Sequence, residues 1–104
     1  MYLGPIVISG ISGRFPSCDD MDQFRDCLLN GVEMTTDKKR WLTENHPKRF
    51  GFVDAIDKFD ASFFGFAPRQ VNQMDPQSRM LLEVTFEAMV DAGIIEAIFP
   101  KYRL

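Results

Sequence analysis

The sequence is short of cysteine and histidine, and this shortage excludes several kinds of chemistry. It has two cysteines, Cys18 and Cys27, which form no CxxC pair, and a single histidine, His46. We expect no metal site, because His46 has no second ligand at the spacing that zinc sites use. A Ser-His-Asp or Cys-His arrangement is not expected either, because this one histidine lies in a polar stretch without obvious partners.

Excess positive charge and long apolar runs are missing as well. The formal net charge is -3 and the pI is near 5.0, which argues against nucleic acid as the main partner because phosphate binding needs a basic face. No apolar run approaches the ~20 residues that span a bilayer. The start, MYLGPIVISG, lacks the basic region of a secretory signal. We therefore expect a cytoplasmic protein with reduced thiols.

What is present is an ordinary globular composition, 45% hydrophobic and 26% charged, in 104 residues, enough for one domain at most. Pro5-Ile6-Val7-Ile8 is a continuous apolar run, typical of a strand buried on both faces of a parallel sheet. The GISG motif that follows could suggest a phosphate loop, but it lacks the third glycine of G-x-G-x-x-G, so a tight, closely packed turn is favoured. Ser12 is no nucleophile elbow, because Arg14 stands where G-x-S-x-G requires glycine.

A first helix is expected after Asp19 or Asp20, whose carboxylate can accept hydrogen bonds from the free amides of the first turn. Gly31 is well placed to end it. Cys27 is interpreted as core filler on the apolar face and Cys18 as part of a polar turn, and neither as a nucleophile. The apolar face consists of Met21, Phe24, Cys27 and Leu28.

The segment TTDKKRWLTENHPKRFG, from Thr35 to Gly51, is polar and is interpreted mostly as loop. Its basic side chains around Trp41 could bind phosphate or single-stranded nucleic acid, but a solvated loop pinned by one buried tryptophan is favoured. Residues 50–53 are expected to form a short extended piece, and a phenylalanine-rich stretch follows. The basic residues are Lys38, Lys39, Arg40, Lys48 and Arg49.

A second helix is expected between Pro76 and Ala92, with Asp75 as its N-cap and Gly93 as its end. Its polar stripe, Arg79, Glu83, Glu87 and Asp91, is interpreted as solvated rather than as a carboxylate set for acid/base or metal chemistry. Its apolar residues fill an arc of roughly 200°, wider than the ≳100° stripe of an ordinary surface helix. They are Leu81, Leu82, Val84, Phe86, Ala88, Met89 and Ala92.

These elements do not make a self-sufficient domain. A strand buried on both faces needs flanking strands, and a helix with so wide an apolar arc needs neighbours on two sides. One good strand and two helices cannot supply them. The sequence therefore predicts the first piece of a larger α/β protein.

The second half carries a recognisable pattern. FDASFFGFAPRQVNQMDPQSRMLLEVTFEAMVDAGI, from Phe59 to Ile94, closely resembles the N-terminal part of β-ketoacyl synthase domains in type I fatty acid synthases and modular polyketide synthases. The opening PIVISGISGRFPSCDDMDQFRDCLLNGVEM resembles the first strand, Gly-rich loop and first helix of the same family. TDKKRW and KRFGFVDAIDKFDASFFG are more similar to animal-type fatty acid synthases. Residues 1–94 are thus identified as an incomplete N-terminal part of such a domain, and residues 95–104 as a divergent tail.

The resemblance implies a thiolase-like α/β/α/β/α fold, a homodimer, and decarboxylative Claisen condensation of acyl chains carried on the phosphopantetheine arm of an acyl carrier protein. In the family an active-site cysteine in a T-A-C-S-S-S-type stretch and two histidines perform the reaction, and none of these motifs occurs here. No catalytic, cofactor-binding or metal-binding residue is therefore predicted, and we expect the chain alone to be inactive. The alternatives are a non-catalytic module that binds a synthase subunit, a polyketide synthase fragment and, weakest, a phosphate or nucleic-acid binder.

Overall fold

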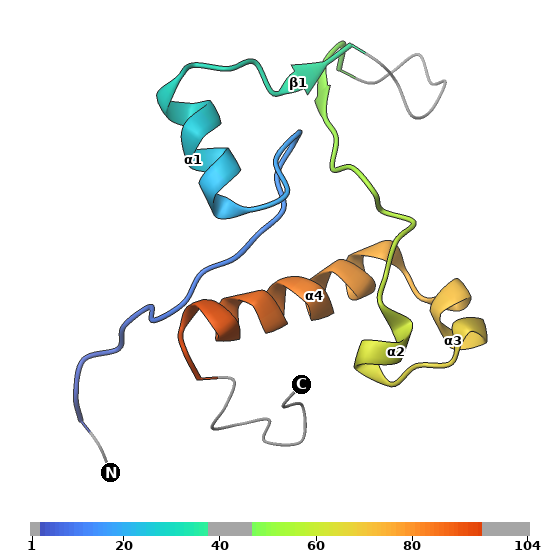
Figure 1. The fold of residues 1–104 in the computed structure, drawn as a ribbon. Coiled ribbons are helices and arrows are strands. Elements are labelled where there is room, and N and C mark those ends of the chain that lie inside the picture. The colour runs from blue at the N-terminus through green and yellow to red at the C-terminus, as the bar shows by residue number, and fades with distance from the viewer. Residues whose placement is uncertain (1–2, 38–46, 95–104) are drawn as a thin grey trace.

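The computed structural model describes residues 3–37 and 47–94 (Figure 1). Trp41, His46 and the basic residues 38–40 lie outside this part of the chain, as does the predicted tail at 95–104. The elements in chain order are α1 (Met21–Leu29), β1 (Thr35–Thr36), β2 (Phe50–Gly51), α2 (Ala61–Phe64), α3 (Pro68–Gln73) and α4 (Pro76–Asp91). Within the described residues, none of these helices is both long enough and apolar enough to cross a membrane.

The predicted ends of the two longer helices are confirmed. Asp20 caps α1, because its Oδ1 accepts a 2.8 Å hydrogen bond from the amide of Gln23. Asp75 caps α4 in the same way through the amide of Gln77, also at 2.8 Å. Beyond the other ends, Gly31 and Gly93 adopt positive φ angles of 64° and 73°, the left-handed conformation that favours glycine.

The predicted strand at residues 5–8 is wrong for this structure. Ile6, Val7 and Ile8 are 102%, 72% and 87% exposed and form no strand. The reason is that a strand needs partners, and the described residues offer none beside this segment. The sheet that does form is a two-residue antiparallel pair of β1 with β2, in which Thr35 faces Gly51. The expected extended piece at residues 50–53 is thus confirmed at Phe50–Gly51 only.

The buried core of the described residues is small. Only Cys18 and Val71 are buried among their apolar side chains, at 1% and 8% exposure. Cys18, predicted to lie in a polar turn, is instead the most deeply buried side chain, because the turn folds it against α1, where Phe15 and Phe24 stack with ring centres 4.0 Å apart. The radius of gyration is 17.4 Å, against the ~13 Å typical of a compact domain of this length. The prediction that these elements do not enclose a core of their own is confirmed.

Candidate functional site

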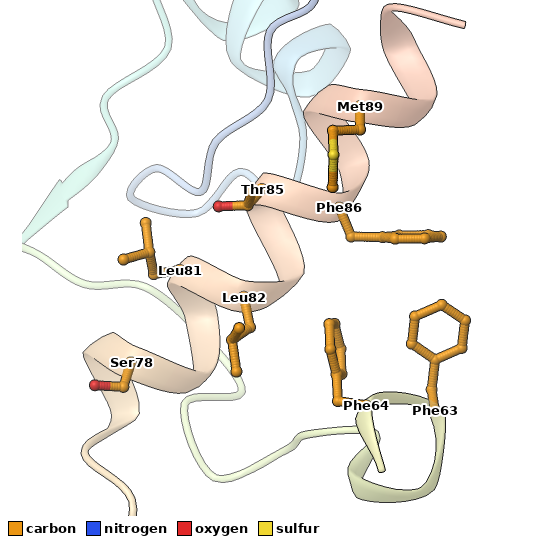
Figure 2. Close-up of a pocket in the computed structure, with 8 residues that line it drawn as sticks. All are labelled: Phe63, Phe64, Ser78, Leu81, Leu82, Thr85, Phe86 and Met89. Carbon is orange, nitrogen blue, oxygen red and sulfur yellow. The ribbon is translucent and has the colours of Figure 1, made fainter. Parts of the chain in front are cut away.

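An apolar groove lies between α2 and α4 and has a volume of about 580 Å³. Figure 2 shows the rings of Phe63 and Phe64 rising from α2 towards Leu82 and Phe86 of α4. Among the described residues, the hydroxyl groups at its wall belong to Ser78 and Thr85, and the other lining side chains there are hydrocarbon apart from the sulfur of Met89. The lining residues are Phe63, Phe64, Ser78, Leu81, Leu82, Thr85, Phe86 and Met89.

The local sequence explains why two rings stand on one side of the groove. Asp60 begins α2 by accepting a hydrogen bond from the amide of Phe63 at 3.1 Å, and Gly65 ends it after four residues at a φ of 75°. Phe63 then meets Phe86 of α4 edge-to-face at 4.7 Å and Phe64 at 5.0 Å, in the geometries that aromatic pairs prefer. The phenylalanine-rich stretch therefore packs α2 onto α4 and leaves one side of both helices open.

The polar stripe of α4 keeps part of its contact with water, since Asp91 is exposed, but it also binds another segment of the chain, which the interpretation made from its spacing did not include. Arg14 lies 3.1 Å from Glu83 and 3.7 Å from Glu87, measured from its Nη2 atom to a carboxylate oxygen of each. The Ser12 hydroxyl donates a 2.7 Å hydrogen bond to Glu87, and the amide of Ile11 donates one of 2.9 Å to Asp91. The stripe therefore binds the loop at residues 10–14. The loop supplies the Arg14 guanidinium, the Ser12 hydroxyl and the Ile11 amide, and α4 supplies three carboxylates.

Arg79, the first member of the stripe, is also engaged. Its Nη2 atom donates a 3.0 Å hydrogen bond to the carbonyl oxygen of Ile56, in the segment that leads to α2. The sequence contained a signal for these contacts, since four charges at i, i+4, i+8 and i+12 form one stripe along the helix, next to its wide apolar arc. The partners lie 23 to 80 residues away in sequence, which is why helix periodicity alone did not reveal them.

Gly10 lets the loop approach α4 closely. A Cβ atom at this position would overlap the carbonyl oxygen of Ala88 and would lie 2.8 Å from the Cβ of Ala92. The close packing expected of GISG is therefore confirmed at Gly10, whereas residues 10–13 form no turn (Figure 1 shows this segment passing beside the C-terminal end of α4).

The groove offers binding surface rather than reactive groups. Neither Cys18 nor Cys27 lines it. In residues 3–37 and 47–94 there is no group of three or more histidine, cysteine, aspartate or glutamate side chains that could hold a metal ion. Three carboxylates line the hollow next to it: Glu83 and Glu87 bind Arg14, and Asp60 caps α2. The groove can therefore accept an apolar surface, and the prediction that the chain has no catalytic residue stays a prediction.

Comparison with known proteins gives a consistent result. The family model "Beta-ketoacyl synthase, N-terminal domain" matches residues 4–102. The fatty acid synthase of the goose Anser anser anser is 50% identical over 92 residues, which cover 86% of this chain and 26% of that protein. A phenolphthiocerol/phthiocerol polyketide synthase of Mycobacterium tuberculosis (strain CDC 1551 / Oshkosh) is 42% identical over 105 residues, 86% of this chain and 7% of that protein.

Solved structures extend the likeness to the fold. The ketosynthase from module 6 of the bacillaene synthase of Bacillus subtilis 168 is similar with a TM-score of 0.74 and 34% identity, over 83% of this chain and 16% of that chain. The oxazolomycin ketosynthase domain OzmH KS7 of Streptomyces albus JA3453 gives a TM-score of 0.77 at 27% identity, over 91% of this chain and 19% of that one. The predicted fold class, the N-terminal part of a thiolase-like α/β fold, is confirmed. The chain spans about a quarter or less of the length of these relatives.

Proposed function

The chain belongs to the β-ketoacyl synthase family, whose N-terminal domain it matches, and from this premise we propose that it supplies the N-terminal part of the ketosynthase of an animal-type fatty acid synthase. The observation that carries the proposal is the 50% identity to the goose fatty acid synthase, against 34% and 42% for two polyketide synthases matched over a similar share of the chain. A polyketide synthase ketosynthase is the nearest alternative.

The reaction proposed for the whole enzyme is the decarboxylative Claisen condensation of acyl and malonyl thioesters in fatty acid biosynthesis. Its proposed partners are a second ketosynthase copy, which makes a homodimer, and an acyl carrier protein that presents the acyl chain on a phosphopantetheine arm. We assign residues 1–94 to the ketosynthase and residues 95–104 to a divergent tail. We also place the protein in the cytoplasm, where both thiols are reduced.

This chain contributes scaffold rather than reactive groups. Its sequence holds one histidine and no T-A-C-S-S-S stretch, so we propose that the 104 residues alone catalyse nothing. The groove between α2 and α4 and the exposed apolar run at Ile6–Ile8 are the surfaces on which the remainder of a ketosynthase domain packs. Burial of each large side chain there contributes ~1.5–3 kcal/mol, which supports tight association with that remainder.

Two measurements test the proposal. In the first, the purified chain is incubated with acyl- and malonyl-carrier protein, and we expect neither covalent acylation nor condensation. In the second, a fatty acid synthase ketosynthase lacking the stretch aligned with this chain is co-expressed with it. We expect the two to co-purify and to recover condensation that neither has alone. Acylation of the isolated chain, or failure to co-purify, would contradict the proposal.

A matched pair of α4 variants locates the contact. Leu82→Lys places a charge in the groove, whereas Gln77→Lys places the same charge on an exposed position of the same helix outside it. We expect Leu82→Lys to abolish co-purification and Gln77→Lys to leave it unchanged, with helix content compared by circular dichroism in both.

A second candidate function is a non-catalytic module that binds an intact synthase. The observation that favours it is the exposure of the apolar run at Ile6–Ile8. Capture of full-length synthase by the immobilised chain, without recovery of activity in the truncated enzyme, would favour this module. Recovery of activity would favour the ketosynthase part.

A further inference from the structure

Three sulfur atoms meet away from the groove. The Sγ atoms of Cys18 and Cys27 lie 3.4 Å apart, and the Sδ atom of Met34 lies 3.7 Å from the Sγ of Cys18. Both cysteines are free thiols; Cys18 is buried and Cys27 is half-buried. These three residues, called the sulfur cluster below, come from the turn before α1, from the last turns of α1, and from the segment before β1.

Backbone hydrogen bonds hold the cluster in place. Phe15 and Cys18 exchange two of them, at 2.9 and 3.0 Å, and Ser17 between them has a positive φ of 60°, which is uncommon for a residue with a side chain. At the end of α1, the amide of Val32 donates to the carbonyl oxygen of Cys27 at 2.9 Å and turns the chain back, so that Met34 returns to Cys18. The sulfur atoms therefore converge because of the fold.

The spacing of the sulfur atoms fits a shared ion better than a covalent bond. Sulfur ligands held ~2.3 Å from one ion are about 3.8 Å apart in a tetrahedral site and about 4.0 Å apart in a trigonal one. The 3.7 Å spacing of Cys18 and Met34 is close to the first value, and the 3.4 Å spacing of the two cysteines needs a shift of a few tenths of an ångström. A disulfide would require the two Sγ atoms to approach to ~2.05 Å. We propose that Cys18, Cys27 and Met34 form a binding site for a soft monovalent cation, copper(I).

The type and the number of the ligands favour this ion. Thiolate and thioether ligands suit soft ions, among them copper(I) and zinc. Zinc sites in proteins almost always have four ligands, and three sulfur atoms meet here, which favours copper(I). Each bound ion displaces the two thiol protons, and the resulting bis-thiolate complex carries one net negative charge.

The test is an anaerobic titration of the 104-residue chain in its complex with the complementary ketosynthase piece, with that piece alone as the reference. Copper(I) is supplied as its acetonitrile complex, against the chromophoric chelator bicinchoninate, and the copper bound by the reference is subtracted. We expect one copper per chain, with sulfur neighbours at about 2.3 Å by X-ray absorption. Cys18→Ser and Cys27→Ser should each weaken copper binding at least ~100-fold, because mutation of a residue that only supports a metal ligand already lowers metal affinity about 10–100-fold. Met34→Leu should weaken it about 10-fold, and Met74→Leu, the matched methionine outside the cluster, should not.

Several results would overturn the site. These are absence of competition with bicinchoninate, equal binding by Met34→Leu and the parent chain, or unchanged affinity after unfolding in guanidinium chloride, which would show that the fold does not gather the ligands. Recovery of a Cys18–Cys27 disulfide in place of copper, seen as a mass loss of two hydrogens with oxidised glutathione as the oxidant, would also overturn it. The methionine pair keeps the test independent of whether the serine variants fold.

Discussion

Gly10 shows how one missing side chain connects two distant parts of the chain. Its Cα lies so close to α4 that an added Cβ would overlap the Ala88 carbonyl oxygen, which is backbone and cannot move aside cheaply. We expect Gly10→Ala to push the loop away from α4, with a cost of ~1–3 kcal/mol, the usual range for overpacking. Faster tryptic cleavage after Arg14 would report the displacement, because the side chain of Arg14 then loses Glu83 and Glu87.

The control for this change is Ser9→Ala, at the neighbouring exposed position. It adds no atom near α4 and should leave the cleavage rate as it is. If trypsin cut the Gly10→Ala and Ser9→Ala chains after Arg14 at the same rate in dilute, cold solution, close packing of the loop against α4 would not be what protects the peptide bond after Arg14.

Cys18 gives a pH-dependent prediction. Its pKa is raised from 9.0 to about 11, chiefly by burial, so the folded chain holds this proton more tightly than the unfolded chain does. The stabilisation is complete below pH 9, and it is lost as the pH rises through about 11. In the complex with the complementary ketosynthase piece, where the chain is folded, we expect iodoacetamide at pH 8 to modify Cys27 well before Cys18, and the difference to shrink towards pH 11. Peptide mapping measures both sites, and equal rates at pH 8 in the folded chain would contradict the burial of Cys18.

Among the elements, α4 determines most of the geometry, because both the groove and the carboxylate stripe belong to it. Its first turn depends on Asp75, which accepts the hydrogen bond from Gln77. We expect Asp75→Ala to cost about 1 kcal/mol of helix stability and Asp75→Asn almost nothing, since asparagine caps as well as aspartate. Circular dichroism at 222 nm, with amide exchange in the first turn, distinguishes the two. Equal helix content in all three chains would show that packing, not the cap, starts the helix.

The elements also show what sequence can reveal. Helix ends were predictable because a cap acts within three residues, as Asp20, Asp75, Gly31 and Gly93 do. The prediction of a strand at residues 5–8 was wrong because strand pairing depends on partners elsewhere in the chain, and none lies beside this segment among the described residues. The interpretation of Glu83 and Glu87 as a solvated stripe missed their contact with Arg14 for a related reason. Arg14 is 69 residues from Glu83, and helix periodicity carries no information about so distant a contact. The Phe63 ring was predictable as packing, but not its partner Phe86.

At the scale of the whole molecule, exposed apolar surface is the dominant feature. Each large side chain left in water forgoes ~1.5–3 kcal/mol, a large share of the net stability of a small domain. We expect the isolated chain to aggregate or to behave as a molten globule, with strong binding of the dye ANS and no cooperative melt. Adding the complementary ketosynthase piece should remove the ANS signal. A dispersed NMR spectrum and a sharp thermal transition from the chain alone would contradict this.

The contact between the loop at residues 10–14 and α4 can form only late in synthesis, because its two sides are far apart in the sequence. Arg14 and Glu83, which it joins, are 69 positions apart, and Ile11 and Asp91 are 80 apart, so the ribosome must make half of α4 before the contact can begin and all of α4 before it is complete. At about 5–20 residues per second, that interval is roughly 4–16 s. The apolar run at Ile6–Ile8 stays exposed even after the loop binds α4, so it is available to chaperones for longer than this interval.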